Sequence, residues 1–278
     1  MKQRIITSVV LFVVALPILI FSKYIVFQAA LAFLSVVAVY EMLGVLGVRS
    51  VYFLSVPSYI LAVAMPLSSY FANDGRHLSY IILIILAVFV YMLYTFAVAV
   101  FKRGALSVGD SASCFMLVSY IAVSFSALGL LRVVPGGELL FELVFLAAWV
   151  TDIFAYFTGY FFGKHKLIPE VSPKKTVEGA IGGIVFSIIG FMLYGLVVDL
   201  VTDYSVRYLV LAVMGLVLSV VSQIGDLTAS LVKREHGVKD YGFIFPGHGG
   251  VMDRFDSIIA VSMPLFVLTV IAVPFVMA

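Results

Sequence analysis

Long apolar stretches recur along almost the whole chain, and they constrain the fold more than any other feature. A membrane-crossing helix needs roughly 20 mostly apolar residues, and about nine such stretches are separated by short turn or charge signals. They use most of the 278 residues, so no separate soluble domain is expected. The sequence therefore predicts an all-α, polytopic integral membrane protein with spans near residues 5–22, 24–46, 51–72, 78–101, 111–133, 139–162, 177–199, 205–229 and 255–277.

Composition agrees with a membrane protein and excludes several kinds of site. Hydrophobic residues make up 63% of the chain and charged residues 12%, about half the charge of a soluble domain. The single cysteine, Cys114, excludes an internal disulfide and a thiolate metal site. The chain also has no P-loop spacing, no nucleophile motif for acyl transfer and no histidine pair at zinc spacing. No nucleic-acid partner is predicted.

The basic residues predict the orientation of the spans. Lys2 and Arg4 precede the first apolar run as in a signal peptide, but that run has no small-residue cleavage pattern, so a retained first helix is expected. With the N-terminus in the cytoplasm, thirteen of the 17 Lys and Arg residues fall on the cytoplasmic side. This is a strong positive-inside signal. The protein is expected to be a multi-pass protein of the cell membrane.

Polar residues are concentrated in two segments in the second half of the chain. We expect a transmembrane region over 1–138 with about five spans, and a catalytic region over 139–278 with about four. The catalytic region has two cytoplasmic loops, 163–176 and 230–254. The first contains Ser-Pro-Lys-Lys-Thr and the second contains Pro-Gly-His-Gly-Gly.

Carboxylates enter the membrane on two of the predicted spans. Asp152 lies on the sixth span, and Asp226 lies on a polar stripe of the eighth. Ionisable groups at such depth are costly and usually face a polar cavity or a partner. Because both stripes end at the two polar loops, one polar cavity facing the cytoplasm is predicted. Asp152 could instead form a structural pair with an arginine, and the Ser172–Thr176 segment could be only a basic flank with a helix start.

The glycine-rich segment and the carboxylates after it favour phosphate chemistry. Closely spaced glycines let backbone N–H groups approach an anion, although His248 could be only a turn residue. Asp253 and Asp256, three residues apart, project to one side of a helix. Mg²⁺ prefers carboxylate and phosphate oxygens. Together with the clustered Lys and Arg, these residues favour phosphoryl or nucleotidyl transfer.

Two segments resemble the phosphatidate cytidylyltransferases, also called CDP-diacylglycerol synthases. Ser230 to Arg234, Lys239-Asp240 and Pro246 to Asp256 match that family's signature over about 27 residues, with the internal spacing intact. Ser-Pro-Lys-Lys-Thr followed by Glu178-Gly179 resembles a second shared segment. The resemblance implies a membrane enzyme that joins CTP and phosphatidate into CDP-diacylglycerol and pyrophosphate and requires Mg²⁺, with the number of metal ions left open. It also implies a homodimer in the cell's inner membrane, in contact with membrane lipid.

Roles follow for the residues that carry the resemblance. We expect metal ligation by Asp226, Asp253 and Asp256. Catalytic charge neutralisation is expected from Asp226 and Asp253 with four basic residues: Lys174, Lys175, Lys233 and Arg234. Substrate binding is expected from Ser172, Thr176, Glu178, Ser230, Lys239, Asp240, Gly247, His248, Gly249, Gly250 and Arg254.

Two other functions use similar features. A secondary transporter or flippase of an anionic solute would also need buried acids and glycine-broken helices, but no inverted-repeat partner is visible in the first half of the chain. A CDP-alcohol phosphotransferase would need a different array of aspartates on one helical segment, and this array is absent from the sequence.

Overall fold

The computed structural model describes residue 13 and residues 17–22, 24–72, 77–102, 106–247 and 249–277. Eight helices within these ranges are long and apolar enough to cross a membrane. The protein is therefore an all-α polytopic membrane protein, with only short strands added. The first predicted span, 5–22, lies mostly outside the described residues, so the count of nine spans stays a prediction.

The chain forms two compact units. The first contains the residues up to Val134 together with Glu235–Phe255, and the second contains Pro135–Arg234 and Asp256–Ala278. The first contains α2 (Ile25–Val45), α3 (Tyr52–Ser68) with the 3-10 turn η1 (Ser69–Ala72), α4 (His77–Phe101) and α5 (Val108–Val133).

An apolar core holds the first unit together. Helix α5 packs on α2, α3 and α4, and α2 also packs on α3. The side chains of Leu43, Leu54, Ile121 and Phe125 are fully buried. At the start of α5, Ser107 accepts a hydrogen bond from the Asp110 N–H and Asp110 accepts one from the Ser107 N–H. This capping box fixes where α5 begins.

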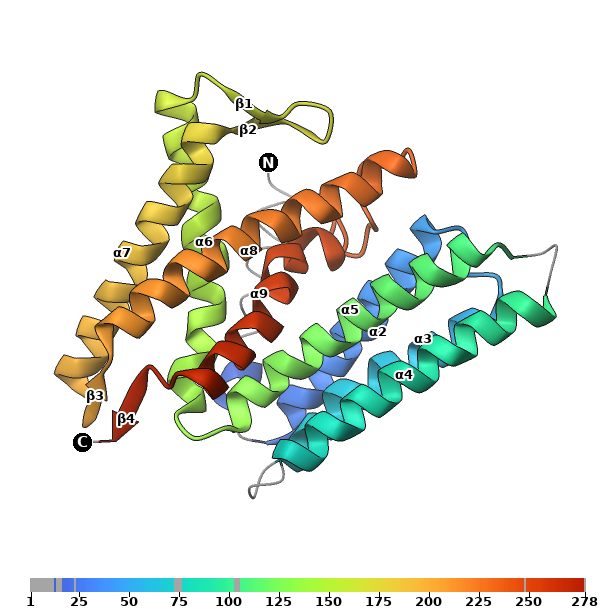
Figure 1. The fold of residues 1–278 in the computed structure, drawn as a ribbon, viewed down its shortest axis with the longest axis horizontal. Helices are drawn as coiled ribbons and strands as arrows, with labels where there is room; N and C mark the ends of the chain where they lie inside the picture. Colours follow the sequence, from blue (N-terminus) through green and yellow to red (C-terminus); the bar gives the residue numbers. More distant parts are fainter. Residues whose placement is uncertain are drawn as a thin grey trace. The chain divides into compact units, whose positions relative to one another are not determined.

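The second unit is built on a helix pair with a β-hairpin between its members. Helix α6 packs along α7 over most of its length, and the hairpin joins them (Figure 1). Helix α8 contacts α6 through Thr151 and Ser219, whose hydroxyls lie 2.9 Å apart. The elements are α6 (Gly137–Phe162), β1 (Lys166–Ile168), β2 (Ser172–Thr176), α7 (Val177–Val201), β3 (Tyr204–Val206), α8 (Tyr208–Glu235), α9 (Met252–Ile271) and β4 (Phe275–Met277). Helix α9 begins in the first unit and continues into the second.

Glycines on α7 let the two helices of the pair approach closely. A Cβ added at Gly182 would collide with the Thr158 side chain on α6, whereas one added at Gly190 would meet Val150 at 3.4 Å, an ordinary contact. Small residues at helix contacts are typical of membrane proteins, because close packing replaces the hydrophobic driving force there.

We therefore expect Gly182→Ala to destabilise the protein by about 1–3 kcal/mol, the usual effect of overpacking. Gly190→Ala is the matched control on the same two helices, and its effect should be much smaller. Thermal unfolding in one detergent measures both variants. Equal melting temperatures for the two would contradict this interpretation of the α6–α7 contact.

The two predicted loops differ from the structure. The predicted loop 230–254 is shorter, because α8 continues to Glu235 and α9 already begins at Met252. Lys233 and Arg234 lie in the last turn of α8, where cations stabilise the helix dipole. The predicted loop 163–176 contains the β1–β2 hairpin.

The last predicted span, 255–277, is also shorter than expected. Helix α9 ends at Ile271, three residues before Pro274, because the residue before a proline disfavours the helical conformation. After the turn, Phe275–Met277 pairs antiparallel with Tyr204–Val206. Apolar composition alone did not separate this short strand from the helix before it.

Candidate active site

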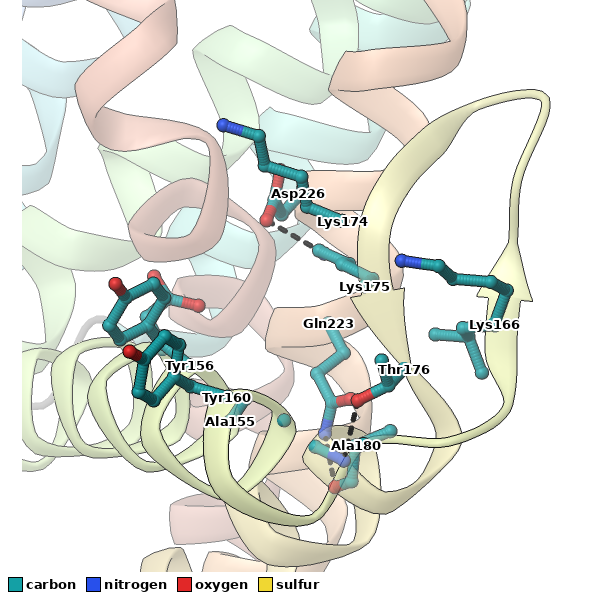
Figure 2. A pocket seen from close by; sticks show the side chains of 15 residues that line it. Ala155, Tyr156, Tyr160, Lys166, Lys174, Lys175, Thr176, Ala180, Gln223 and Asp226 are labelled. Atoms are coloured by element: carbon teal, nitrogen blue, oxygen red, sulfur yellow. Dashed lines mark hydrogen bonds and ion pairs between the residues drawn. The ribbon is translucent and has the colours of Figure 1, made fainter.

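A cavity of about 570 Å³ lies in the second unit, among α6, the hairpin, α7 and α8. Its charged side chains are Asp152, Lys166, Lys174, Lys175 and Asp226, and Thr176 and Gln223 are uncharged polar side chains beside them. Apolar and aromatic groups of α6, including Tyr156 and Tyr160, line it as well (Figure 2). The cavity therefore combines positive and negative side chains with an apolar wall.

An ion pair joins the hairpin to α8 inside this cavity. The Lys175 ammonium lies 2.7 Å from Oδ2 of Asp226, and both side chains are about three-quarters buried (Figure 2). The Ser230 hydroxyl, one helical turn after Asp226, donates to Oδ1 of the same carboxylate at 3.4 Å. The predicted residues Lys175, Asp226 and Ser230 are thus brought together.

Local structure fixes the direction in which Lys175 points. The hairpin register pairs Lys166 with Thr176, so Lys174 and Lys175 lie on its second strand, just before α7 begins. Thr176 accepts a hydrogen bond from the Gly179 N–H at 3.1 Å and caps the helix. The Ser172–Thr176 segment therefore does lead into a helix start, which was the alternative interpretation. The same segment also supplies Lys175 to the ion pair with Asp226.

Three carboxylates of the second unit lie within electrostatic range of one another. Asp226 interacts with both Asp152 and Asp256, and Lys233 interacts with Asp256. The Ser257 hydroxyl donates to Oδ2 of Asp152 at 3.4 Å, and the Ser257 N–H donates to Oδ1 of Asp256 at 2.8 Å. Like charges this close repel each other unless cations are near. A divalent cation would therefore be stabilised at this cluster.

Carboxylates of the described residues nevertheless do not form a complete metal cage. Within the described part of the chain, no group of three or more His, Cys, Asp or Glu side chains has the arrangement that holds an ion by itself. Mg²⁺ commonly uses only one or two protein carboxylates and takes its other ligands from substrate phosphates and water. Asp226 with Asp256 fits that pattern.

Asp253 lies in the first unit, where it holds the backbone at Tyr241 and at Gly250. Its Oδ2 accepts hydrogen bonds from the Tyr241 N–H at 2.8 Å and the Gly250 N–H at 3.0 Å. Gly247 and Gly249 have positive φ angles of 78° and 89°, which side chains other than glycine adopt only with strain. His248 lies outside the described residues. Because Asp226 belongs to the other unit, metal binding by Asp226 and Asp253 together stays a prediction.

Glu178 lies at the base of the hairpin. Its carboxylate accepts hydrogen bonds from the backbone N–H groups of Lys164 and His165 at 3.1–3.3 Å, and the His165 imidazole Nδ1 lies 2.6 Å away. These contacts tie the start of α7 to the segment that leads into β1. Glu178 thus holds in place the hairpin that presents Lys174 and Lys175.

For this reason we expect Glu178→Ala to loosen the hairpin. Amide hydrogen exchange should become faster over residues 164–176 and stay unchanged in α8, because the lost contacts are local. Unchanged exchange in the hairpin would show that Glu178 does not hold it.

The remaining predicted residues lie on the segments that flank these sites. Ser172 begins β2 and Arg234 lies in the last turn of α8. Lys239 and Asp240 lie between α8 and α9, and Arg254 lies in the first turn of α9. None of the five is part of the cavity lining found among the described residues.

Two polar residues that are prominent in the structure were not expected from the sequence. Gln223 lines the cavity and donates to the Ala180 carbonyl on α7 at 3.2 Å. Glu41 is buried in α2 and accepts hydrogen bonds at the start of α9. Both lie within apolar spans, so the rule that intramembrane polar residues have partners could have identified them.

Fold and cavity together define a polytopic membrane protein with lysines and carboxylates gathered among its helices. Comparison of sequences identifies it further. The chain belongs to the cytidylyltransferase family, whose sequence profile matches residues 2–272, and it is therefore a nucleotidyltransferase.

Similar proteins cover almost the whole chain. The phosphatidate cytidylyltransferase of Staphylococcus epidermidis is 37% identical over 267 residues, which is 95% of this chain and 97% of the relative. The enzymes of the same name from Staphylococcus saprophyticus and Staphylococcus aureus are each 36% identical over 269 residues, with the same coverage. Both units of the structure thus have counterparts in these enzymes.

Proposed function

We propose that this protein is a phosphatidate cytidylyltransferase that converts CTP and phosphatidate into CDP-diacylglycerol and pyrophosphate for phospholipid synthesis. The observation that carries the proposal is the match to enzymes of this name over 95% of the chain. The cavity supports it, because lysines beside an apolar wall suit a substrate with a phosphate headgroup and acyl chains.

The reaction needs no nucleophile from the protein. An oxygen of the phosphatidate phosphate attacks the α-phosphorus of CTP, a new P–O bond forms, and the bond between the α-phosphorus and the bridging oxygen breaks in line to release pyrophosphate. Catalysis is then mostly positioning and charge neutralisation. Lys174 and Lys175 bind phosphate oxygens, and Asp226 orients Lys175 through the 2.7 Å ion pair.

Magnesium fits the donor set of the second unit. Asp226 and Asp256 would hold the ion, and the bound ion would neutralise charge on the phosphates during transfer. Two lysines would offset the negative charge of these ligands: Lys175 pairs with the Asp226 carboxylate, and Lys233 interacts electrostatically with that of Asp256.

Orientation and assembly complete the proposal. Thirteen of the 17 Lys and Arg residues fall on the side of the two polar loops, which favours a cavity open to the cytoplasm, where CTP is available. Phosphatidate would enter from the adjacent leaflet of the cell membrane. The resemblance to the family supports a homodimer.

Identification of the product tests the reaction. The purified protein would be incubated in detergent with Mg²⁺, phosphatidate of one defined acyl composition and CTP. Mass spectrometry should detect CDP-diacylglycerol with the acyl chains of the added lipid. A product that lacks the cytidylyl group, or no product from folded protein, would overturn the proposal.

A further inference from the structure

Glu41 is a buried carboxylate in the first unit with two partners more than 200 residues away in sequence. It lies on α2 and is 4% exposed. The Val251 N–H donates to its Oε1 at 3.0 Å, and the Met252 N–H donates to its Oε2 at 2.9 Å. Met252 is the first residue of α9, so Glu41 caps α9 from another helix. It also faces the positive end of the helix dipole.

The backbone at Gly242 and at Gly250 packs directly against this carboxylate. A Cβ added at Gly242 or at Gly250 would collide with the Glu41 side chain. Arg49 lies near enough to interact with the carboxylate electrostatically, and its guanidinium stacks 3.8 Å from the centre of the Tyr40 ring. Glu41 therefore has a cation nearby, and its side chain limits where the backbone at Gly242 and Gly250 can run.

The carboxylates of Asp253 and Glu41 thus each accept hydrogen bonds from different backbone N–H groups of this region. Asp253 accepts from the N–H groups of Tyr241 and Gly250, and Glu41 accepts from those of Val251 and Met252. Three consecutive N–H groups, from Gly250 to Met252, are consequently held by side chains. Because Asp253 follows directly after Met252, the position of its backbone depends on the bond that Glu41 makes.

We propose that Glu41 is a positioning residue that holds the backbone of residues 250–252, and through it Asp253, in the arrangement needed for cytidylyl transfer. The inference rests on the proposed function and adds a residue to its site. Glu41 is not a catalytic residue, since it acts through the backbone of 250–252. Packing alone does not explain it, because a carboxylate inside an apolar span is costly and an apolar side chain would fill the space.

Glu41→Gln tests this proposal most directly. It keeps the size of the side chain but replaces one acceptor oxygen with an N–H donor, which would face a backbone N–H group. We expect kcat to fall about 10–100-fold, as when partners of metal ligands are removed, while KM for phosphatidate stays unchanged. Amide exchange should become faster at Tyr241 and at residues 250–252, with the melting temperature close to that of the wild type.

Two further variants make the test decisive. Gln28→Ala is the matched control, because Gln28 is also buried on α2 and its side-chain N and O atoms have no hydrogen-bond partner among the described residues. It should lower the melting temperature while kcat and exchange at 250–252 stay at wild-type values. If Glu41→Gln does not fold, Gly242→Ala is a second variant. It places a methyl group against the Glu41 carboxylate and should also lower kcat.

The outcomes distinguish the inference from the function it rests on. Wild-type protein that forms no CDP-diacylglycerol would remove the proposed function, and the inference with it. An active wild type whose Glu41→Gln variant keeps its kcat and its exchange pattern would overturn the inference alone. A fall in kcat of equal size in Gln28→Ala would also overturn it, because the effect would then be general destabilisation of α2.

Discussion

Asp226→Asn should lower pyrophosphate release with CTP and phosphatidate at least about 100-fold, the usual size of effect when a group that stabilises transition-state charge is lost. The substitution keeps the shape of the side chain but removes the charge that pairs with Lys175 at 2.7 Å and faces Asp152 and Asp256. It also weakens a ligand proposed for Mg²⁺. The measurement is the steady-state rate of purified protein, together with the melting temperature.

Asp199→Asn is the matched control for this substitution. Asp199 lies near the end of α7 remote from the hairpin and accepts a hydrogen bond from the Tyr208 hydroxyl at 3.3 Å. The same change of charge there should leave the rate unchanged. If Asp226→Asn kept a near-normal rate, Asp226 would have no part in metal binding or in orienting Lys175.

Lys175→Ala is expected to have the second-largest effect, a loss of about 100-fold in kcat/KM for CTP. The ammonium group lies inside the cavity and would bind phosphate oxygens, so its loss leaves negative charge on both substrates without compensation. It also leaves Asp226, Asp152 and Asp256 to repel one another. Initial rates over a range of CTP concentrations separate the effect on kcat from that on KM.

Two comparisons show whether Lys175 acts within the site. Lys164→Ala removes a lysine outside the cavity lining, whose backbone N–H to Glu178 remains, and it should retain wild-type kinetics. The double variant with Asp226→Asn should lose less activity than the product of the two single losses, because paired residues are not additive. Fully additive losses would mean that the ion pair has no role in the reaction.

Much of the fold could be predicted because the bilayer sets helix length. Apolar stretches of about 20 residues mark the spans, and the eight helices of the described residues that are long enough to span all correspond to predicted stretches. The ends were harder to predict, since α8 continues through Lys233 and Arg234 to Glu235. Such a polar last turn has no hydropathy signal, and strands of three residues such as β3 and β4 have too few residues for a periodic pattern.

Site residues could be predicted only where charged side chains lie within a recognisable sequence motif. Lys175 and Asp226 were both expected to act on phosphates and metal, and the structure joins them in an ion pair. Glu41 was not expected, because its partners Val251 and Met252 are distant in sequence and contribute backbone groups, which no side-chain pattern reveals. The two-unit organisation likewise depends on contacts between distant segments.

The most direct test of the proposed function is pyrophosphate release by the purified protein in detergent with Mg²⁺. CTP, UTP, ATP and GTP would each be supplied with and without phosphatidate, and the Asp226→Asn variant would serve as the background. We predict release that depends on both CTP and phosphatidate and is at least about 100-fold lower in the variant. No release from folded wild-type protein with any nucleotide, or release that does not depend on the lipid, would contradict a phosphatidate cytidylyltransferase.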